Sequence, residues 1–273
     1  MVFDLASVPA YSGQPYAIVN DNKPYFTDAD LTAVSFETYS DLDSLGRCGV
    51  AYASVGKDLM PTEERSSIGQ VKPSGWHTIK YDNVDGKYLY NRCHLIGYQL
   101  TAENANEKNL ITGTRYLNVQ GMLPFENMAA DYVKETGNHV LYRVTPVFEG
   151  SNLVASGVLM EAESVEDKGE GILCCVYVYN VQLGININYA TGDSSASGTN
   201  QTAVTEQATQ AVTQAASQQT STESYILNTN TKKFHRPSCS SVKQMKESNK
   251  KSSSESRDAL IAAGYDPCKK CNP

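Results

Sequence analysis

One stretch of the chain, residues 90–126 (YNRCHLIGYQLTAENANEKNLITGTRYLNVQGMLPFE), holds the residue types that phosphate chemistry needs. His94 can take a proton from water near neutral pH. Asn118 offers a neutral amide oxygen to a hard cation such as Mg²⁺. Arg92 lies two residues before His94, so on an extended segment the two side chains share a face, and its guanidinium can pair with a phosphate oxygen. Together they predict that a base, a bound metal ion and a positively charged side chain act on one phosphate group.

The local pattern predicts the elements that would position these groups. A strand ends at residues 92–94, a polar loop follows over 101–108, and a short strand covers 109–114. Asn118 then lies on a helix predicted over 114–123. A second helix is predicted over 125–136, with a break or kink at Pro124, because proline lacks an N–H and crowds the preceding turn.

The rest of the first 190 residues is rich in strand patterns. Three β-branched and aromatic runs, 139–148, 153–162 and 172–182, are separated by turn residues and predict an antiparallel meander. Residues 50–55 and 78–81 are further strand candidates. Strands flanking a few helices predict the α+β class.

Residues 90–126 resemble the signature region of the DNA/RNA non-specific endonucleases, the ββα-metal or His-Me finger nucleases, whose motif is D-R-G-H. The likeness is greatest to streptococcal-type secreted nucleases and runs over roughly residues 35–190. It implies a ββα-metal core with His94 as general base and Asn118 as the direct protein ligand of Mg²⁺. It also implies Arg92 as a phosphate clamp, Asn109 as a supporting residue and Glu126 as a residue that holds metal-bound water.

The chain departs from that motif at two positions, since Asn91 replaces its aspartate and Cys93 its glycine. Asparagine can hydrogen-bond but carries no charge. The family also has an arginine well upstream of the motif, and Arg47 and Arg65 both qualify. Cys48 lies in the upstream LGRCG segment, so a Cys48–Cys93 disulfide beside the site is one hypothesis and two independent buried thiols are the other.

Two further histidines are rivals for the role of base. His77 lies in the GWHTIKY segment without a neighbouring arginine or a downstream asparagine at the right spacing, and His139 opens a predicted strand. Both are interpreted as structural residues.

The charge of the chain is unevenly distributed. Residues 1–190 hold 13 Lys and Arg against 23 Asp and Glu, whereas residues 225–273 hold 10 basic and 4 acidic residues. An acidic body argues against capture of nucleic acid by its overall field. An anionic substrate would need the metal ion and local cations, for which Arg92, Lys108 and three others are candidates: Arg115, Lys72 and Lys80.

The last 83 residues differ in composition from the body. Residues 191–224 are rich in Thr, Ser, Gln and Ala and predict a disordered linker. Residues 225–273 contain the spacing H-x3-C-x28-C-x2-C, formed by His235, Cys239, Cys268 and Cys271. This tail resembles the small zinc module of the bacterial alkylation-repair regulator Ada, with a histidine as first ligand. One histidine and three cysteines suffice for tetrahedral Zn²⁺, and a disulfide within the tail is the alternative.

The sequence therefore predicts a nuclease domain over 1–190, a linker over 191–224 and a zinc-binding module over 225–273. The predicted function is Mg²⁺-dependent, sequence-nonspecific hydrolysis of phosphodiester bonds in DNA and also in RNA. The alternatives are a non-catalytic nucleic-acid-binding protein with a degenerate site and the tail as tether, and a surface protein with two adhesive modules. No apolar run is long enough to span a membrane, and the resemblance implies a secreted or cell-surface protein although no signal peptide is visible.

Overall fold

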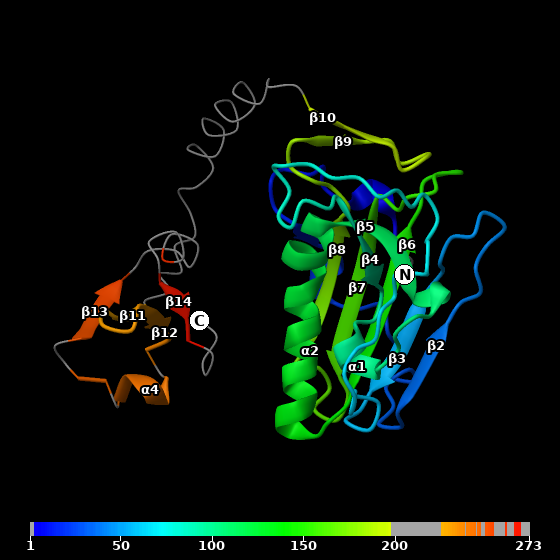
Figure 1. The fold of residues 1–273 in the computed structure, drawn as a ribbon. Helices are drawn as coiled ribbons and strands as arrows, with labels where there is room; N and C mark the ends of the chain where they lie inside the picture. Colours follow the sequence, from blue (N-terminus) through cyan, green and yellow to red (C-terminus); the bar gives the residue numbers. More distant parts are fainter. Residues whose placement is uncertain are drawn as a thin grey trace. The chain divides into compact units, whose positions relative to one another are not determined.

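The computed structural model of the 273-residue chain describes residues 3–197, 225–237, 239–243, 245–246, 249–253, 260 and 265–268. The chain divides into two units, Met1–Thr199 and Asn200–Pro273, which are called the N-terminal and C-terminal units below (Figure 1). Most of the predicted linker, 198–224, lies outside the described residues.

A six-stranded antiparallel sheet forms the frame of the N-terminal unit, in the order β1-β8-β7-β6-β3-β2. The predicted meander is confirmed, because three long neighbouring strands follow one another in the chain. The strands are β1 (Tyr16–Ile18), β2 (Phe36–Tyr39), β3 (Ala51–Val55), β6 (Val140–Val147), β7 (Gly157–Ser164) and β8 (Leu173–Tyr179).

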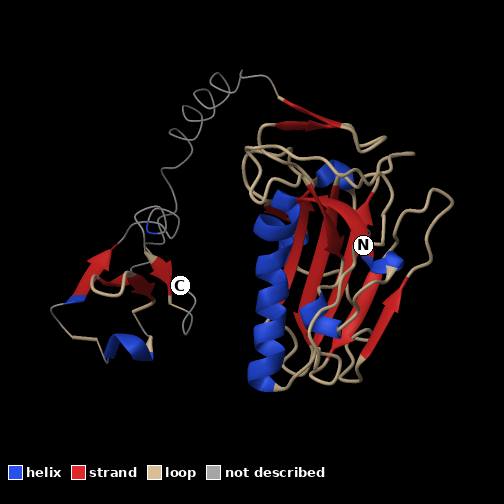
Figure 2. Cartoon of the chain, viewed as in Figure 1, coloured by secondary structure: helices blue, strands red, loops and turns tan. Residues whose placement is uncertain are grey.

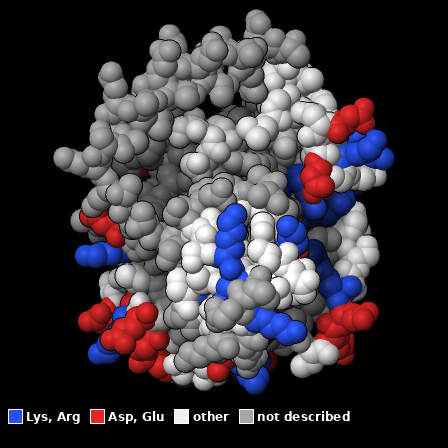
Figure 3. Space-filling view, turned by 90° about the vertical axis from the view of Figure 1, so that its left-hand side faces the viewer, with Lys and Arg blue, Asp and Glu red and all other residues white. Residues whose placement is uncertain are grey.

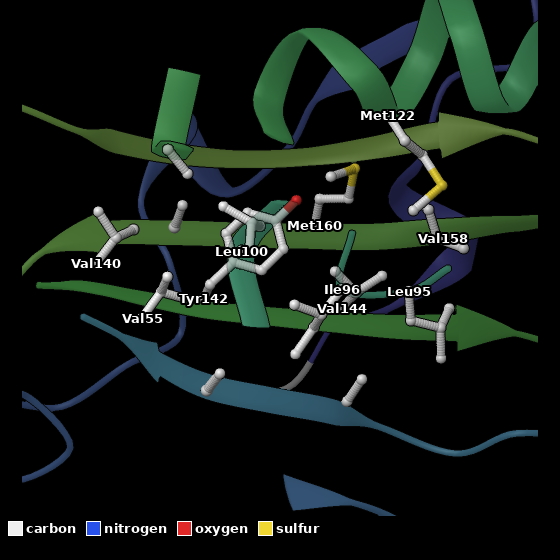
Figure 4. Close-up of a cluster of buried hydrophobic side chains, with 14 of the residues drawn as sticks. Val55, Leu95, Ile96, Leu100, Met122, Val140, Tyr142, Val144, Val158 and Met160 are labelled. Carbon is white, nitrogen blue, oxygen red and sulfur yellow. The ribbon is translucent and has the colours of Figure 1, made fainter. Parts of the chain in front are cut away.

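One face of this sheet packs against helix α2 (Leu123–Thr136), which lies along the strands (Figures 1 and 2). Val140, Tyr142 and Val144 alternate along β6 and point into the same core, where they meet Met160 and Met122 (Figure 4). This spacing of two residues is what a strand with one face in the core requires. The antiparallel, sheet-rich α+β class predicted from sequence is thus confirmed.

The opposite face of the sheet is covered by the N-terminal segment. Tyr177 and Tyr179 of β8 pack there against Phe3 and Tyr11, with η1 (Leu5–Ser7) and η2 (Asn20–Asn22) in the covering chain. With both faces covered, the sheet is a rigid base for the elements that carry the predicted site.

Those elements are a two-stranded hairpin and the helix that follows it. β4 (Tyr90–His94) pairs antiparallel with β5 (Leu110–Thr114), and α1 (Tyr98–Thr101) and η3 (Glu107–Asn109) lie in the loop between them. A π-helical turn, η4 (Leu117–Met122), then leads into α2. The order strand, strand, helix is the ββα arrangement that the sequence predicts.

The expected break at Pro124 is wrong in its detail. Pro124 lies in the first turn of α2, where its missing N–H has no helical partner to lose. The chain therefore passes from the π-helical turn directly into α2, without an intervening loop.

A second hairpin, β9 (Ile185–Ile187) with β10 (Ser194–Ala196), follows the sheet. It belongs to the N-terminal unit, so the ordered chain of this unit continues beyond residue 190.

The described part of the C-terminal unit is a small sheet in the order β13-β11-β12-β14 with one short helix. Its core consists of Tyr225, Leu227, Phe234 and Leu260. The face drawn in Figure 3 carries both basic and acidic side chains. The elements are β11 (Tyr225–Asn228), β12 (Lys233–His235), α4 (Ser240–Lys243), β13 (Lys250–Ser253) and β14 (Asp266–Pro267).

In the described parts of the chain, no helix has the length and apolar character needed to cross a membrane.

Candidate active site and candidate metal centre

His94 is the last residue of β4, and two partners hold its ring. Its Nε2 lies 2.7 Å from the backbone carbonyl oxygen of Asn104, in the loop between β4 and β5. Because a carbonyl can only accept a hydrogen bond, Nε2 carries the proton and Nδ1 keeps a lone pair. The guanidinium Nη2 of Arg65 lies 3.2 Å from that Nδ1. The basic atom of the imidazole is thus Nδ1.

The surroundings of His94 keep its ring neutral. Burial and then the positive charge of Arg65 lower its pKa to about 4, against the opposing effect of the Asn104 carbonyl. At pH 7 the imidazole is therefore unprotonated and able to accept a proton.

His94 opens onto a cavity of about 650 Å³, called the catalytic pocket below. The pocket gathers the metal-ligand candidate Asn118 from η4, Glu126 from α2 and three arginines from different segments. Its lining is formed by Arg65, Ile68, Trp76, Thr78, Tyr88, Tyr90, Asn91, Arg92, His94, Gly97, Tyr98, Arg115, Asn118, Leu123 and Glu126. Residues up to about 60 positions apart in the chain thus meet in one cavity.

Asn118 and Glu126 supply oxygen donors to this pocket. Asn118 lies in the π-helical turn, a local geometry often found at functional sites. An amide oxygen and a carboxylate are ligands that a hard cation such as Mg²⁺ prefers. The donor chemistry of the pocket therefore fits the metal ion that the sequence predicts.

Glu126 is almost completely buried in the first turn of α2. Burial raises its pKa to about 7, although the charge of Arg65 and a hydrogen bond from Gln99 act in the opposite direction. Its carboxylate lies directly over Gly97, where an added Cβ would come within 2.5 Å of Oε2. Only glycine at position 97 leaves room for this carboxylate.

Arg92 lines the pocket with its guanidinium already held in place. It donates hydrogen bonds to the carbonyl oxygens of Val71 and Gly69, and it lies 4.0 Å from the ring centroid of Trp76. These contacts leave other N–H donors of the fork for a phosphate, since guanidinium has five. Arg92 thus has the fixed geometry that an anion clamp requires.

Asn109 does not line the pocket. It is fully buried, its side-chain oxygen accepts from the N–H of Ile96 at 2.9 Å, and its amide donates to the carbonyl of Ile96 at 3.0 Å. The pair of bonds fixes the backbone two residues after His94. Asn109 is therefore in a position to support the site without touching a substrate.

The structure distinguishes the two upstream arginines. Arg65 lines the pocket beside His94, whereas Arg47 binds Asp43 and the carbonyl oxygens of Gly150 and Asn152. Arg47 thus ties two surface loops together, and Arg65 is the one of these two arginines that lines the pocket.

The hypothesis of a Cys48–Cys93 disulfide is wrong, because both thiols are free. The Cys48 thiol donates to the carbonyl oxygens of Glu107 and Leu110. The Cys93 thiol packs over Gly113 of the paired strand, where an added Cβ would lie 2.4 Å from its sulfur. The alternative of two independent buried thiols is the one that the structure shows.

The rival histidines and most other candidate cations lie elsewhere. His77 contacts the carbonyl of Thr191, and His139 contacts Ser35 and Glu166. Lys108 pairs with Asp41 at 2.6 Å, whereas Arg115 lines the pocket and pairs with Asp85. Neither rival histidine is part of the catalytic pocket.

Sequence reasoning did not identify three contributors to the site. Asn104 acts through its backbone carbonyl, which no side-chain type reveals. Trp76 supports Arg92 across a loop, and Gly97 makes room for Glu126. Of these, only the glycine gave a visible signal, since it follows closely after His94 in the segment that carries the motif.

The C-terminal unit contains a second cluster, called the tail site below. The ligand atoms of His235, Cys239 and Cys268 lie within 4.8 Å of one another, and all three residues are buried. The Nδ1 atom of His235 is buried and has no hydrogen-bond partner in the described structure. One imidazole and two thiols are donors that Zn²⁺ prefers, so the set fits this metal. The fourth predicted ligand, Cys271, lies outside the described residues.

Comparisons with known proteins agree with the class of enzyme that this geometry indicates. The sequence model of the DNA/RNA non-specific endonuclease family matches residues 28–166, about half of the chain. The search of curated protein sequences found no match to this chain.

Solved structures of two nucleases are similar in fold. NucA from Streptococcus agalactiae, solved without metal and with magnesium bound, is 22% identical with a TM-score of 0.61. The match covers 71% of this chain and 92% of NucA. Sda1 nuclease with bound zinc is 33% identical with a TM-score of 0.51, covering 60% of this chain and 82% of Sda1.

The ββα hairpin and its polar pocket thus define a nuclease, a metal-dependent hydrolase that cuts within nucleic acid chains. More particularly, the chain belongs to the DNA/RNA non-specific endonuclease family.

Proposed function

We propose that this endonuclease hydrolyses the phosphodiester bonds of DNA, and also of RNA, in a Mg²⁺-dependent reaction with His94 as general base. The observation that carries the proposal is the meeting of His94, Asn118, Glu126 and three arginines in one pocket. Such a site grips the backbone and a metal ion rather than base edges, which suits a nuclease without sequence preference.

In this proposal His94 accepts the proton of the attacking water at Nδ1. The Asn104 carbonyl holds the Nε2 proton, so the ring cannot turn its basic atom away from the pocket. Arg65 lies at Nδ1 in the structure. A bound phosphate would attract that guanidinium and leave the lone pair to the water.

Two further residues would stabilise the reacting phosphate. Arg92, fixed by Val71, Gly69 and Trp76, would donate to a phosphate oxygen as negative charge develops. Asn118 would hold Mg²⁺ directly, and Glu126 would hold its water. When bound, Mg²⁺ supplies charge stabilisation at the phosphate and at the departing 3′ oxygen. The family resemblance implies 5′-phosphate and 3′-hydroxyl products.

The proposal is tested by incubating supercoiled plasmid and RNA with the wild type, His94→Ala and a matched variant, His77→Ala. With Mg²⁺, the wild type and His77→Ala should cleave at similar rates. His94→Ala should be slower by about 10²- to 10⁴-fold, the usual contribution of a general base. A chelator should stop all three proteins.

Activity of His94→Ala near the wild-type rate, or activity that a chelator leaves unchanged, would contradict the mechanism. Binding of nucleic acid with no cleavage by the wild type would instead support a degenerate site in a binding protein. Salt titration belongs in the same experiment, since contacts to phosphates weaken steeply with ionic strength.

For the C-terminal unit we propose Zn²⁺ at the tail site, held by His235, Cys239, Cys268 and Cys271. Two observations support this proposal: the ring of His235 lies close to two thiols, and its buried Nδ1 has no hydrogen-bond partner within the described residues. The bound metal would link β12 to the chain at Cys268 and so stabilise a unit with a small core.

The basic residues of the same unit support a role as a nucleic-acid tether. Lys233 on β12 and Lys251 on β13 are exposed. A plot of log affinity against log salt concentration has a negative slope. Replacing both lysines with glutamine should make that slope less steep by about 2, since each phosphate contact contributes about 0.9. An unchanged slope in a filter-binding assay would favour a wall- or partner-binding role.

The resemblance to secreted nucleases supports a secreted or cell-surface location. Fractionation of the producing cells, followed by detection of the protein in medium, surface and cytoplasmic fractions, tests that location.

A further inference from the structure

The wall of the catalytic pocket is unusually aromatic for a site that handles phosphate. Trp76, Tyr88, Tyr90 and Tyr98 all line it. Three of these side chains are engaged with the protein. Trp76 stacks with the Arg92 guanidinium, the hydroxyl of Tyr90 donates to the carbonyl of Gly192, and the hydroxyl of Tyr98 donates to the carbonyl of Glu63.

Tyr88 differs from these three in its exposure. It is 47% exposed, whereas Tyr90 two residues later is buried. The ammonium group of Lys80 lies 4.5 Å from the centroid of the Tyr88 ring, and the backbones of the two residues form a β-bridge. Lys80 thus supports one face of the ring, and the opposite face is the one on which a planar group would stack.

Tyr88 is also aligned with the catalytic groups. Tyr90, Arg92 and His94 alternate along β4, and Tyr88, which precedes a bend at Leu89, lines the same pocket. At about 3.3 Å per residue of extended chain, Tyr88 lies at most about 20 Å from His94 along the backbone. A strand held with a phosphate at His94 and Arg92 would therefore bring a base a few nucleotides away to Tyr88.

The charges around the ring suit the same ligand. Lys80 lies on the ring and Arg115 lines the same pocket, where its guanidinium is held by Asp85. Exposed aromatic rings next to cations in a groove that follows the backbone are the usual means of holding single-stranded nucleic acid, because every base has a face that can stack.

We propose that Tyr88 is a stacking platform for an unpaired nucleobase, so that the preferred substrates are single-stranded or locally unpaired nucleic acids. The proposal rests on the proposed function, since it takes His94 as the position of the scissile phosphate. A base within a duplex is stacked between its neighbours and hydrogen-bonded to its partner, and it would have to leave both to reach the ring.

The test uses the full-length protein with His94→Ala as background, so that nucleic acid is bound but not consumed. Affinity is measured with Mg²⁺ for a short oligonucleotide that contains 2-aminopurine, once single-stranded and once as a duplex. Loss of the ring in Tyr88→Leu should weaken single-strand binding by about 10-fold, within the usual range for one stacked base, and should abolish quenching of the probe. Tyr88→Phe keeps the ring and should keep both signals.

Tyr16→Leu is the matched control, since Tyr16 is 37% exposed on edge strand β1 and does not line the pocket. It should bind like the background protein. Tyr88→Leu that binds the single strand unchanged, or that loses single strand and duplex equally, overturns the proposal. Thermal unfolding of each variant separates a lost contact from a lost fold.

The two proposals fail in different ways. If the wild type does not cleave nucleic acid with Mg²⁺ while Tyr88→Leu still loses single-strand binding, the catalytic mechanism fails and the stacking platform stands. If the wild type cleaves and the ratio of kcat/KM for single strand to duplex is the same in Tyr88→Leu, the stacking platform fails alone.

Discussion

His94 and His235 each end a β-strand and are almost equally buried, at 6% and 5% exposure. Their ring nitrogens differ. Nε2 of His94 is bonded to a carbonyl and its Nδ1 lies beside a guanidinium, whereas Nδ1 of His235 has no hydrogen-bond partner in the described structure. Both ring nitrogens of His94 therefore have a neighbouring polar group of the protein. The ring of His235 instead lies close to two cysteine thiols.

The difference follows from what holds each unit together. The catalytic pocket is attached to a sheet with a large apolar core that includes Tyr142, Met160 and Met122. The described core of the C-terminal unit has four buried side chains. Small units usually need a metal or disulfides because their cores are too small. We therefore expect metal to serve chemistry in the first unit and folding in the second.

The largest effect should come from removing a ligand of the tail site. Cys268→Ser should lose bound zinc and the fold of the C-terminal unit, because structural zinc contributes about 10–16 kcal/mol in small zinc-binding peptides. Metal analysis and hydrogen exchange of the full chain measure both. Cys175→Ser, at a buried cysteine of β8, is the control and should keep the zinc. Retention of one zinc per chain in Cys268→Ser would contradict the assignment.

The next effect concerns pH. Protonation of Glu126, whose pKa is raised to about 7, should lower the rate as the pH falls below 7. Because His94 acts as a base only when unprotonated, and its pKa is lowered to about 4, a second fall is expected as the pH drops through about 4. Arg65→Gln removes a positive charge that lowers this pKa, so its acid limb should lie at higher pH. Rate profiles at saturating Mg²⁺, with circular dichroism at each pH, check this. Identical acid limbs would show that Arg65 does not act on His94.

A smaller effect is expected where close packing shapes the catalytic pocket. Gly97→Ala would place a Cβ 2.5 Å from Oε2 of Glu126, so the carboxylate must move and cleavage should fall by about 10-fold, as small displacements in active sites do. Gly46→Ala, whose added Cβ would meet nothing within 4 Å and which does not line the pocket, should cleave normally. Equal rates for both variants would mean that Glu126 has no role.

The smallest effect is expected at one of two buried polar atoms that have no hydrogen-bond partner in the described structure. The hydroxyl of Tyr142 lies in the apolar core of the N-terminal unit, whereas Nδ1 of His235 belongs to a ring of the tail site. Tyr142→Phe should raise the free energy of unfolding by about 1 kcal/mol, because an unsatisfied buried group is removed. Chemical denaturation measures it. A clear loss of stability would mean that the hydroxyl has a partner, such as a buried water.

Much of the site could be predicted because its residues lie close together in sequence. Arg92 and His94 alternate on one strand, which is a local signal, whereas the roles of Asn118 and Glu126 followed from the resemblance of this continuous segment to the family motif. Strands such as 139–148 were predictable for the same reason, since alternation of apolar residues is a local signal.

What could not be predicted depends on contacts between distant parts of the chain. Choosing Arg65 over Arg47 required the path of a loop that returns to the hairpin, and the Asn104 carbonyl is a backbone group. The Cys48–Cys93 hypothesis failed because nearness to one site does not fix the direction of two side chains, and here each thiol has its own buried surroundings.

The central claim is that the imidazole of His94 takes the proton of the attacking water. Its most direct test is chemical rescue of His94→Gly by added imidazole, with plasmid cleavage followed in Mg²⁺. We predict an inactive variant whose rate rises with the concentration of unprotonated imidazole, while the wild type and His77→Gly do not respond. A His94→Gly variant that cleaves near the wild-type rate without imidazole would contradict the claim.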